Sequence, residues 1–282
     1  MAMTQETCQS MNWNKKLLNT PVIGDITKKI VSMKVDHDAK NIAEHFTQFL
    51  EPQVAINDAL RHEVFKIRHN VYCEELAFEE IKEEGLEQDE FDPQSIFSMI
   101  KHKPSNVYTS CVRLVKSSCA KELLPIEKFC IDSIQDKALH PSKFERHEIA
   151  EISRLAVKAD FRRRKTDQFK GSAVGVISET TYSETELRCF PFIAIGLYMS
   201  AATMAIDTGI KHVFVMMEPR LARSMKFVGI KFHQLGAAID YHGLRAPYYI
   251  NPEIFMSNLS PGFKSLYHAI EKDIGQQLKN NK

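Results

Sequence analysis

Arginines alternate with aromatic residues along one predicted helix. The segment RHEVFKIRHNVY (61–72) follows Asn57 and Asp58, two good helix N-caps, and residues three or four positions apart in it share one face. On that face lie Arg61, Phe65, Arg68 and Tyr72. A solvent-exposed face seldom holds arginines in register with aromatic rings. The pattern therefore indicates either a charged functional cluster or arginine stems that lie beside a packed aromatic stripe.

Four further short segments carry charged residues that could do chemistry. They are EQDEFD (87–92), CVRLV (111–115), PIEKF (125–129) and EISRLAV (151–157). Alternating side chains predict strands at 107–115 and over the last of these segments. In that last segment, a period of two places Glu151 and Ser153 on one face. Ile152 and Arg154 are expected on the opposite face. The acidic segment, taken alone, also fits a solvated loop.

In this order and with this spacing, the five segments resemble the acyl-homoserine-lactone synthases and their relatives, the N-acyl amino acid synthases. Those enzymes have the fold of the GCN5-related N-acetyltransferases (GNAT). The resemblance is close over about 55–160. The residues that match the family's motifs are Arg61, Phe65, Arg68, Asp89, Asp92, Arg113, Phe129, Glu151, Ser153 and Arg154.

The later part of the chain resembles one subgroup. The segments RCFPFIAIGLYMSA (188–201) and KFVGIKFHQLGAAIDYHGLRAPYYI (226–250) look like the acyltransferases associated with the PEP-CTERM/exosortase system, which are close to the N-acyl amino acid synthases. The whole resemblance then covers about 55–255. It implies transfer of a fatty acyl group from a thioester to an amine, without a covalent enzyme intermediate and without a tightly bound cofactor.

The resemblance also assigns roles to the strand at 151–157. This strand is expected to separate from its neighbour, so that the pantetheine arm of the donor pairs with the backbone of Leu155, Ala156 and Val157. Glu151 is the candidate general base, acting through a water molecule, and desolvation could raise its pKa. The alternative is that Glu151 only pairs with an arginine.

A charged cluster is implied around the acceptor. Asp89 and Asp92 are each expected to pair with an arginine from the set Arg61, Arg68, Arg113 and Arg154. A spare arginine, Arg61 or Arg113, would then bind the carboxylate of an amino-acid acceptor in a two-pronged geometry. The alternative is a purely structural network of ion pairs. Further substrate contacts are expected from Phe65, Arg68, Tyr72, Phe129 and Ser153.

Two departures from the family pattern bear on the substrates. A tryptophan of the homoserine-lactone synthases is replaced by Val71, which argues against S-adenosylmethionine as the acceptor. The pyrophosphate loop of acetyltransferases is replaced by FRRRKTD (161–167), without a glycine until Gly171, which argues against free acyl-CoA as the donor. The basic residues of this loop fit an acidic acyl carrier protein and its phosphate, or a solvated turn; they are Arg162, Arg163, Arg164 and Lys165.

Two other functions stay open at this point. A homoserine-lactone synthase would consume S-adenosylmethionine and release methylthioadenosine. A non-catalytic acyl-binding module would keep the fold without turnover. The composition argues against nucleic acid as a partner, because 37 Lys+Arg against 36 Asp+Glu give a net charge of only +1 in 282 residues. Aromatic interleaving of the kind that binds single strands is also missing from the basic loop.

The cysteines carry no metal or disulfide pattern. No two cysteines form a CxxC pair, and none has the spacing of a zinc site. The six cysteines are Cys8, Cys73, Cys111, Cys119, Cys130 and Cys189. They indicate free thiols in a reducing cytoplasm, with Cys111 and Cys130 as packing residues. No signal peptide is recognised at the N-terminus. We expect no metal site and a cytoplasmic location.

These motifs need a mixed α/β domain to position them. We expect a GNAT-like mixed central sheet flanked by helices over residues 51–282, preceded by an N-terminal extension over residues 1–50. The uncharged run at 189–206 could cross a membrane, but its Pro, Gly, Ser and Thr favour a buried helix. Apolar residues of this helix and of the strand at 213–217 are candidates for the acyl slot.

The remaining expected elements follow from hydrophobic periodicity. Helices are predicted at 38–50, 57–72, 191–208, 219–227 and 261–278, and strands at 107–115, 151–157 and 212–217, with one or two more strands between 232 and 248.

Overall fold

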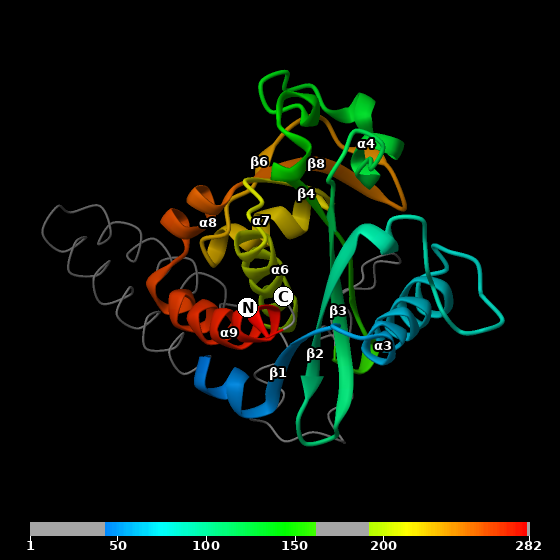
Figure 1. Cartoon of the computed structure of the whole chain (residues 1–282), viewed down its shortest axis with the longest axis vertical. Coiled ribbons are helices and arrows are strands. Elements are labelled where there is room, and N and C mark those ends of the chain that lie inside the picture. The colour runs from blue at the N-terminus through cyan, green and yellow to red at the C-terminus, as the bar shows by residue number, and fades with distance from the viewer. Residues whose placement is uncertain (1–42, 162–191, 281–282) are drawn as a thin grey trace, which may run out of the picture.

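The computed structural model describes residues 43–161 and 192–280 (Figure 1). Its strands are β1 (Leu50–Val54), β2 (Ser95–His102), β3 (Val107–Lys116), β4 (Ile149–Val157), β5 (His212–Met217), β6 (His233–Gln234), β7 (Ile239–Asp240) and β8 (Leu244–Ile250). Its helices are one over residues 43–49, α3 (Asp58–Arg68), α4 (Pro125–Phe129), α6 (Ile193–Asp207), α7 (Pro219–Phe227), α8 (Pro252–Asn258) and α9 (Pro261–Lys279). A π-helical segment, η1 (His69–Glu75), extends α3.

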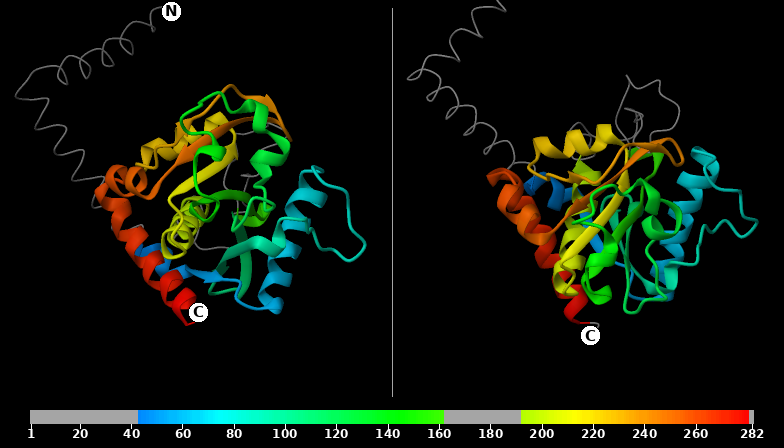
Figure 2. Two further views of the ribbon diagram at one scale, coloured as in Figure 1. Left: turned by 45° about the horizontal axis from the view of Figure 1, so that its top comes forward. Right: turned by 90° about the horizontal axis from the view of Figure 1, so that it is seen from above.

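The described strands form one mixed sheet. Its order is β1-β2-β3-β4-β5-β8-β6, and β7 pairs with β8. β4 and β5 run parallel, whereas the other neighbouring strands are antiparallel. Helices flank the sheet: α6 and α9 cover one face, and α3 covers the other (Figures 1 and 2). This architecture confirms the predicted fold class.

Most of the predicted elements are confirmed. The strands β3, β4 and β5 and the helices α6, α7 and α9 lie where the periodicity placed them. The N-cap of α3 is also confirmed, since the Asn57 side chain accepts a hydrogen bond from the backbone N–H of Leu60 at 2.9 Å. The region after Phe232 holds three short strands rather than one or two.

The sequence analysis missed β1 and β2. The sequence analysis predicted a helix that ends at residue 50 and no strand after it, but Leu50–Val54, with Pro52 in the middle, form β1. β1 lies at the edge of the sheet, where a proline without a backbone N–H is tolerated. In β2, residues on both faces are buried, so the alternation that marks a half-exposed strand is missing.

The helix over residues 43–49 packs into the body of the protein. Phe46 and Leu50 are almost fully buried. A Cβ atom added to Gly196 of α6 would lie 2.7 Å from the Phe46 ring, so the absence of a side chain lets the two helices approach. Residues 1–42 lie outside the described part of the chain, and the division of the chain at residue 50 stays a prediction.

α6 is a buried helix, as the sequence analysis favoured. Its residues face the sheet on one side and α9 on the other, and Ile193, Leu197 and Met204 are completely buried. No helix of the described residues is both long and apolar enough to cross a membrane.

Candidate active site

β4 and β5 separate in the middle of the sheet. The two strands pair as far as Ile152↔Val215 and no further. β4 continues beside β3 to Val157, whereas β5 continues beside β8 to Met217. The second halves of both strands therefore have no β4–β5 hydrogen bonds. The separation implied by the family resemblance is present at the predicted strand.

A β-bulge in β4 decides the face on which Arg154 lies. The β3–β4 register shifts between Cys111 and Arg113, and Arg154 has a left-handed backbone with φ 48°. Its side chain lines the same cleft as Glu151 and Ser153. The prediction that Arg154 lies on the opposite face was wrong, because a period of two holds only while the strand is regular.

Tyr72 holds the bulged part of β4 in place. Its hydroxyl donates a hydrogen bond to the backbone carbonyl of Leu155 at 2.8 Å. The central carbon of the Arg154 guanidinium lies 5.4 Å from the centroid of the Tyr72 ring. Burial raises the pKa of Tyr72 to about 12, so the hydroxyl keeps its proton and stays a donor at neutral pH. Tyr72 reaches this position from η1, and π-helical segments are frequent at functional sites.

A cleft of about 490 Å³, partly open to solvent, lies on this face of the sheet, and we call it the polar cleft. It is lined by Tyr72, Phe78, Glu79, Arg113, Pro125, Glu151, Ser153, Arg154, Met216, Tyr241, His242 and Arg245. The structure thus brings together predicted site residues from η1, β3 and β4. The sequence analysis did not select Tyr241, His242 and Arg245, which the β7–β8 hairpin contributes.

Glu151 is buried in the polar cleft, with only 2% of its surface exposed. One carboxyl oxygen accepts a hydrogen bond from the backbone N–H of Ile126 at 2.6 Å. Burial raises the pKa of Glu151 to about 8, against the opposing effects of this hydrogen bond and of the positive charge on Arg113. The nearby Arg113 and Arg154 pair with carboxylates of other residues. A carboxyl group that titrates close to working pH suits a general base.

Asp89 and Asp92 join arginines from different elements. One oxygen of Asp92 accepts from Arg68 at 2.6 Å and from Arg113 at 2.7 Å. Arg113 also donates to Asp89 at 2.5 Å and to the Ser153 hydroxyl at 3.1 Å. Burial opposes the charge on Asp89, but the charge of Arg113 and its hydrogen bond outweigh this and lower the pKa of Asp89. The expected pairing of both aspartates with arginines is therefore present.

Glu87 belongs to the same network, although the sequence analysis did not select it. Glu87 is 3% exposed and forms ion pairs with Arg68 and, at 3.2 Å, with Arg154. Burial opposes ionisation, but the hydrogen bond from Arg68 outweighs it and lowers the pKa of Glu87. Glu79 adds a further pair with Arg154 at 2.9 Å. Glu87 opens the segment EQDEFD, but its burial distinguishes it from the exposed Glu83, Glu84 and Glu90, and the sequence pattern does not show burial.

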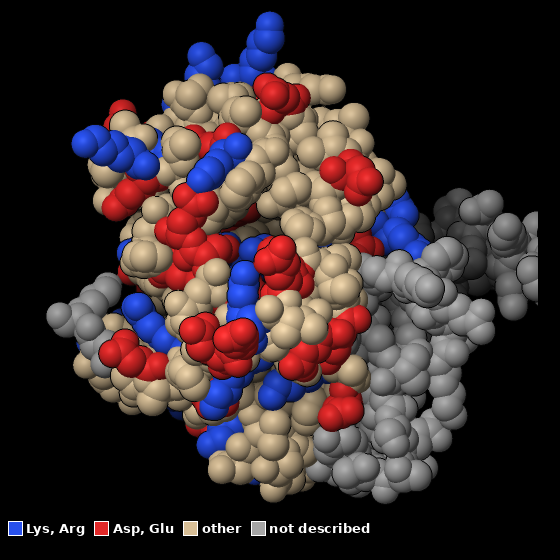
Figure 3. All heavy atoms as spheres, turned by 90° about the vertical axis from the view of Figure 1, so that its right-hand side faces the viewer, with Lys and Arg blue, Asp and Glu red and all other residues tan. Residues whose placement is uncertain are grey.

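Arg61 lies apart from Glu151. With Phe65 it lines a second cleft beside α3, of about 880 Å³ including open solvent, whose other lining residues are Asp58, His62, Gln88, Asp89, Asp92 and Pro93. The Arg61 guanidinium lies 5.9 Å from the centroid of the Phe97 ring. Acidic and basic side chains lie interspersed on this face of the molecule (Figure 3). The aspartates that pair with Arg113 separate Arg61 from the polar cleft.

Phe129 lies at the edge of the polar cleft and is 51% exposed. Its ring centroid is 6.4 Å from that of Tyr241, which lines the cleft, and 5.9 Å from that of Phe91. The predicted carrier-docking loop, Arg162, Arg163, Arg164 and Lys165, lies outside the described residues.

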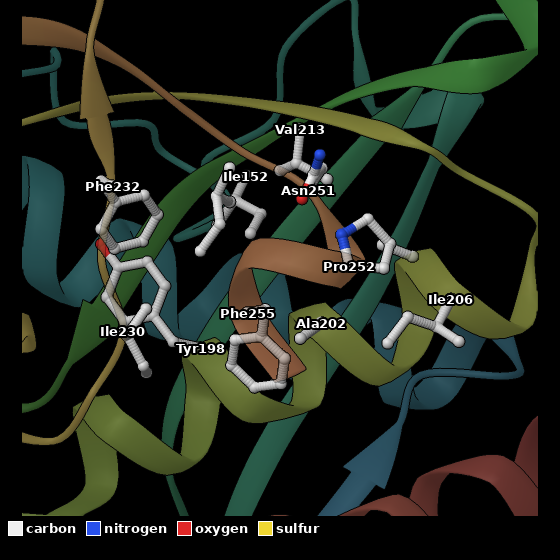
Figure 4. Close-up of a pocket in the computed structure, with 12 residues that line it drawn as sticks. Ile152, Tyr198, Ala202, Ile206, Val213, Ile230, Phe232, Asn251, Pro252 and Phe255 are labelled. Atoms are coloured by element: carbon white, nitrogen blue, oxygen red, sulfur yellow. The ribbon is translucent and has the colours of Figure 1, made fainter. Parts of the chain in front are cut away.

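A third hollow, of about 380 Å³ including open solvent and lined mostly by apolar side chains, lies on the opposite face of β4 (Figure 4), and we call it the apolar cavity. Its lining residues are Ile152, Tyr198, Ala202, Ala205, Ile206, Val213, Ile230, Phe232, Ile250, Asn251, Pro252 and Phe255. Ile152 stands between Glu151 and Ser153, so neighbouring residues of one strand line the two cavities. Burial raises the pKa of Tyr198 and the charge of Arg245 opposes this, so Tyr198 lies within electrostatic reach of the polar cleft.

Three of the four described cysteines fit packing roles, whereas Cys119 is exposed. Cys73, Cys111 and Cys130 are buried free thiols. Burial raises the pKa of Cys111 to about 12 and that of Cys130 to about 11, so both stay protonated and are poor nucleophiles at neutral pH. Among the described residues, no group of three or more His, Cys, Asp or Glu side chains could hold a metal ion.

Comparisons with known proteins agree with this architecture. Residues 67–170 match the family model described as an acetyltransferase (GNAT) domain. The matched segment, which is less than half of the chain, is similar to a GNAT domain. It contains η1, β2, β3 and β4, and hence Glu151 and the arginines that pair with Asp89 and Asp92. A search of curated proteins found no match.

Solved structures of other proteins resemble this chain. TofI, in a ternary complex with an inhibitor and MTA, matches with a TM-score of 0.53 and 14% identity, over 75% of this chain and 98% of that one. BjaI, a CoA-dependent acyl-homoserine lactone synthase with SAM and isopentyl-CoA, matches with a TM-score of 0.52 and 15% identity, over 80% of this chain and 89% of that one. FeeM, an N-acyl amino acid synthase from uncultured soil microbes, matches with a TM-score of 0.49 and 14% identity, over 74% of this chain and 94% of that one. The matches to TofI and BjaI show that the chain shares their fold.

Proposed function

We propose that this chain transfers a fatty acyl group from the thioester of an acyl carrier protein to the amine of an amino acid. The observation that carries the proposal is the arrangement around β4. A buried carboxyl group with a pKa of about 8 lies in a polar cleft, and an apolar cavity lies behind the same strand, where β4 and β5 separate. A reaction that joins a polar amine to a long apolar acyl group needs both environments next to each other.

The reaction needs a deprotonated amine at the thioester carbon. Glu151, as a carboxylate and through a water molecule, takes a proton from the acceptor's ammonium group. The amine nitrogen then forms a bond to the thioester carbon, and the tetrahedral intermediate collapses with loss of the carbon–sulfur bond. The proton held by Glu151 passes to the departing pantetheine thiolate, and the newly bonded nitrogen loses its second proton to water, so one proton is released overall for each ammonium group that is acylated. No enzyme nucleophile is needed, and the raised pKa of Cys130 supports this.

The donor arm enters where β4 has lost its partner strand. Backbone groups of Leu155, Ala156 and Val157 lie in the part of β4 that does not pair with β5, and they are the candidates that bind pantetheine and the oxyanion. The acyl chain occupies the apolar cavity between α6 and β5. No tightly bound cofactor takes part. Docking of the carrier protein on Arg162–Lys165 stays a prediction, as do the cytoplasmic location and the PEP-CTERM/exosortase association.

One comparison favours a second candidate function. BjaI is a CoA-dependent acyl-homoserine lactone synthase, and it shares the fold of this chain at a TM-score of 0.52. By analogy, the chain would then use acyl-CoA and S-adenosylmethionine and release methylthioadenosine. The absence of the family's tryptophan at Val71 argues for the amino-acid acceptor instead.

One assay separates the candidates. The purified chain is incubated with decanoyl and hexadecanoyl acyl carrier protein or the matching acyl-CoA, together with pooled amino acids or S-adenosylmethionine, and the products are identified by mass spectrometry. The proposal predicts N-acyl amino acids from the carrier-protein donor. Methylthioadenosine release with acyl-homoserine lactone would establish the second candidate. Loss of product in Glu151→Gln excludes a contaminating enzyme.

A further inference from the structure

Arg245 is the least satisfied charged group of the polar cleft. It lies at the start of β8, opposite Ile239 of β7, and its side chain is partly buried. Its Nε atom is buried and has no hydrogen-bond partner among the described residues. The guanidinium carbon lies 6.0 Å from the centroid of the Phe78 ring, so the flat group is held beside an aromatic side chain.

The other arginines of the polar cleft differ from Arg245 in their partners. Arg113 donates to two aspartates and a serine, and Arg154 pairs with Glu79 and further carboxylates. Both are thus neutralised by the protein itself. Arg245 has no carboxylate partner among the described residues. A buried N–H without an acceptor costs free energy, so a cleft that retains one is suited to a ligand that supplies the acceptor.

We propose that Arg245 binds the carboxylate of the acceptor amino acid. This rests on the proposed function and names the acceptor's chemical class, an amine that also carries a carboxylate. The planar guanidinium presents parallel N–H groups that match the two oxygens of a carboxylate. Glu151, in the same cleft, faces the ammonium end of the same molecule. Arg245 takes the role that the sequence analysis gave to Arg61 or Arg113, because Arg61 lines another cleft and Arg113 is already paired.

A competition experiment tests this assignment. The full-length chain is incubated with a decanoyl thioester and an equimolar pool of the twenty amino acids and their amides, and each N-decanoyl product is quantified by mass spectrometry. The parent chain is expected to acylate free amino acids in preference to amides. Arg245→Gln should lower the acid-to-amide product ratio by about tenfold to a hundredfold, the range of a charge-assisted hydrogen-bond pair. The acid-to-amide ratio of Arg245→Lys should lie between those of the parent and of Arg245→Gln, because lysine keeps the positive charge but loses the two parallel N–H groups of the guanidinium.

The product ratio keeps the result independent of folding. Both products come from the same folded molecules, so a variant that is partly unfolded still reports its own selectivity. Arg223→Gln, at an exposed arginine of α7 outside the polar cleft, is the matched control and should leave the ratio unchanged.

Three outcomes would overturn the assignment. A parent chain that acylates amides as readily as acids, or a preference for acids that survives Arg245→Gln, removes Arg245 from acceptor recognition. A rise in the Michaelis constant of the thioester alone would place Arg245 on the donor instead. If the parent chain acylates none of the forty amines, the proposed function itself fails. Acylation of acids and amides alike is a different result: it contradicts the role of Arg245 but leaves the proposed function in place.

Discussion

The two faces of β4 carry cavities of opposite chemistry within the width of one strand. On one face, Glu151 and Ser153 line the polar cleft among arginines and carboxylates. On the other, Ile152 lines the apolar cavity against α6. The pleat of the strand separates the two environments, and they lie at the same level of the sheet because Glu151 and Ile152 are adjacent residues, just before β4 and β5 separate. A single strand therefore carries a buried carboxyl group and an apolar cavity side by side while keeping the two environments chemically distinct.

The largest effect on turnover is expected from a change in the polar cleft. Glu151→Gln should lower turnover by about 10²- to 10⁴-fold, because the variant cannot accept a proton. In the parent chain, turnover should rise with pH and level off above a pKa near 8, since the carboxyl group is protonated below that value. Thioester consumption measured from pH 6 to pH 9 checks both statements. Unchanged turnover in the variant would remove Glu151 from the mechanism.

The folding of the same variant provides its control. The pKa of Glu151 is raised from 4.5 to about 8 in the folded chain, so the charged form is disfavoured there. Between these pH values the folded chain binds more protons than the unfolded chain, and the stability of the parent therefore falls as pH rises. Glu151→Gln should become more stable relative to the parent over this window, which thermal unfolding at pH 5 and pH 8 would measure.

The ion pairs behind the polar cleft should contribute most of its rigidity. Asp92→Asn removes the charge that Arg68 and Arg113 share, and it should cost about 3–5 kcal/mol of unfolding free energy because both arginines are buried. Glu90→Gln is the matched control. Its pair with Lys128 is solvent-exposed, so the cost should be about 0–1 kcal/mol. Denaturant unfolding measures both, and equal costs would contradict a special role for the buried pairs.

A smaller effect is expected from filling the apolar cavity. Ala202→Leu adds a branched side chain to the wall that α6 contributes. The variant should favour shorter acyl chains, and its relative yield of each product should fall by about tenfold for each added methylene group that no longer fits. Mass spectrometry of products from mixed eight- to sixteen-carbon donors reports the shift. The acid-to-amide ratio should not move, because it depends on the other face of β4. An unchanged chain-length profile would place the acyl group elsewhere.

The smallest effect is expected from the thiol near the cleft. Cys130→Ala should keep turnover within about threefold of the parent, because a thiol with a pKa of about 11 is protonated at neutral pH. A loss comparable to that of Glu151→Gln, together with an acyl adduct on Cys130 in the parent, would replace direct transfer by a covalent intermediate.

Much of the site could be predicted from local patterns. The segments that carry Arg68, Asp92 and Arg113 were recognised by their resemblance to the motifs of a known family, and the structure brings them together in ion pairs. The alternation of faces along the strand predicted the wrong face for Arg154. A β-bulge depends on how two strands pair and not on the composition of either strand. It also missed Glu87, since nothing local distinguishes a buried glutamate from its exposed neighbours.

The sequence by itself determined the residue types, their order along the chain and the periodicity that forms β3, β4, β5, α6 and α9. It made Glu151 a candidate base through the resemblance of the segment EISRLAV to the donor strand of a known enzyme family. Only the tertiary structure decided that Glu151 is buried, which raises its pKa to about 8, because burial requires α4 and β3 to close over it. Only the tertiary structure brought Arg245 into the polar cleft, because the β7–β8 hairpin reaches that cleft through long-range strand pairing that no local pattern encodes.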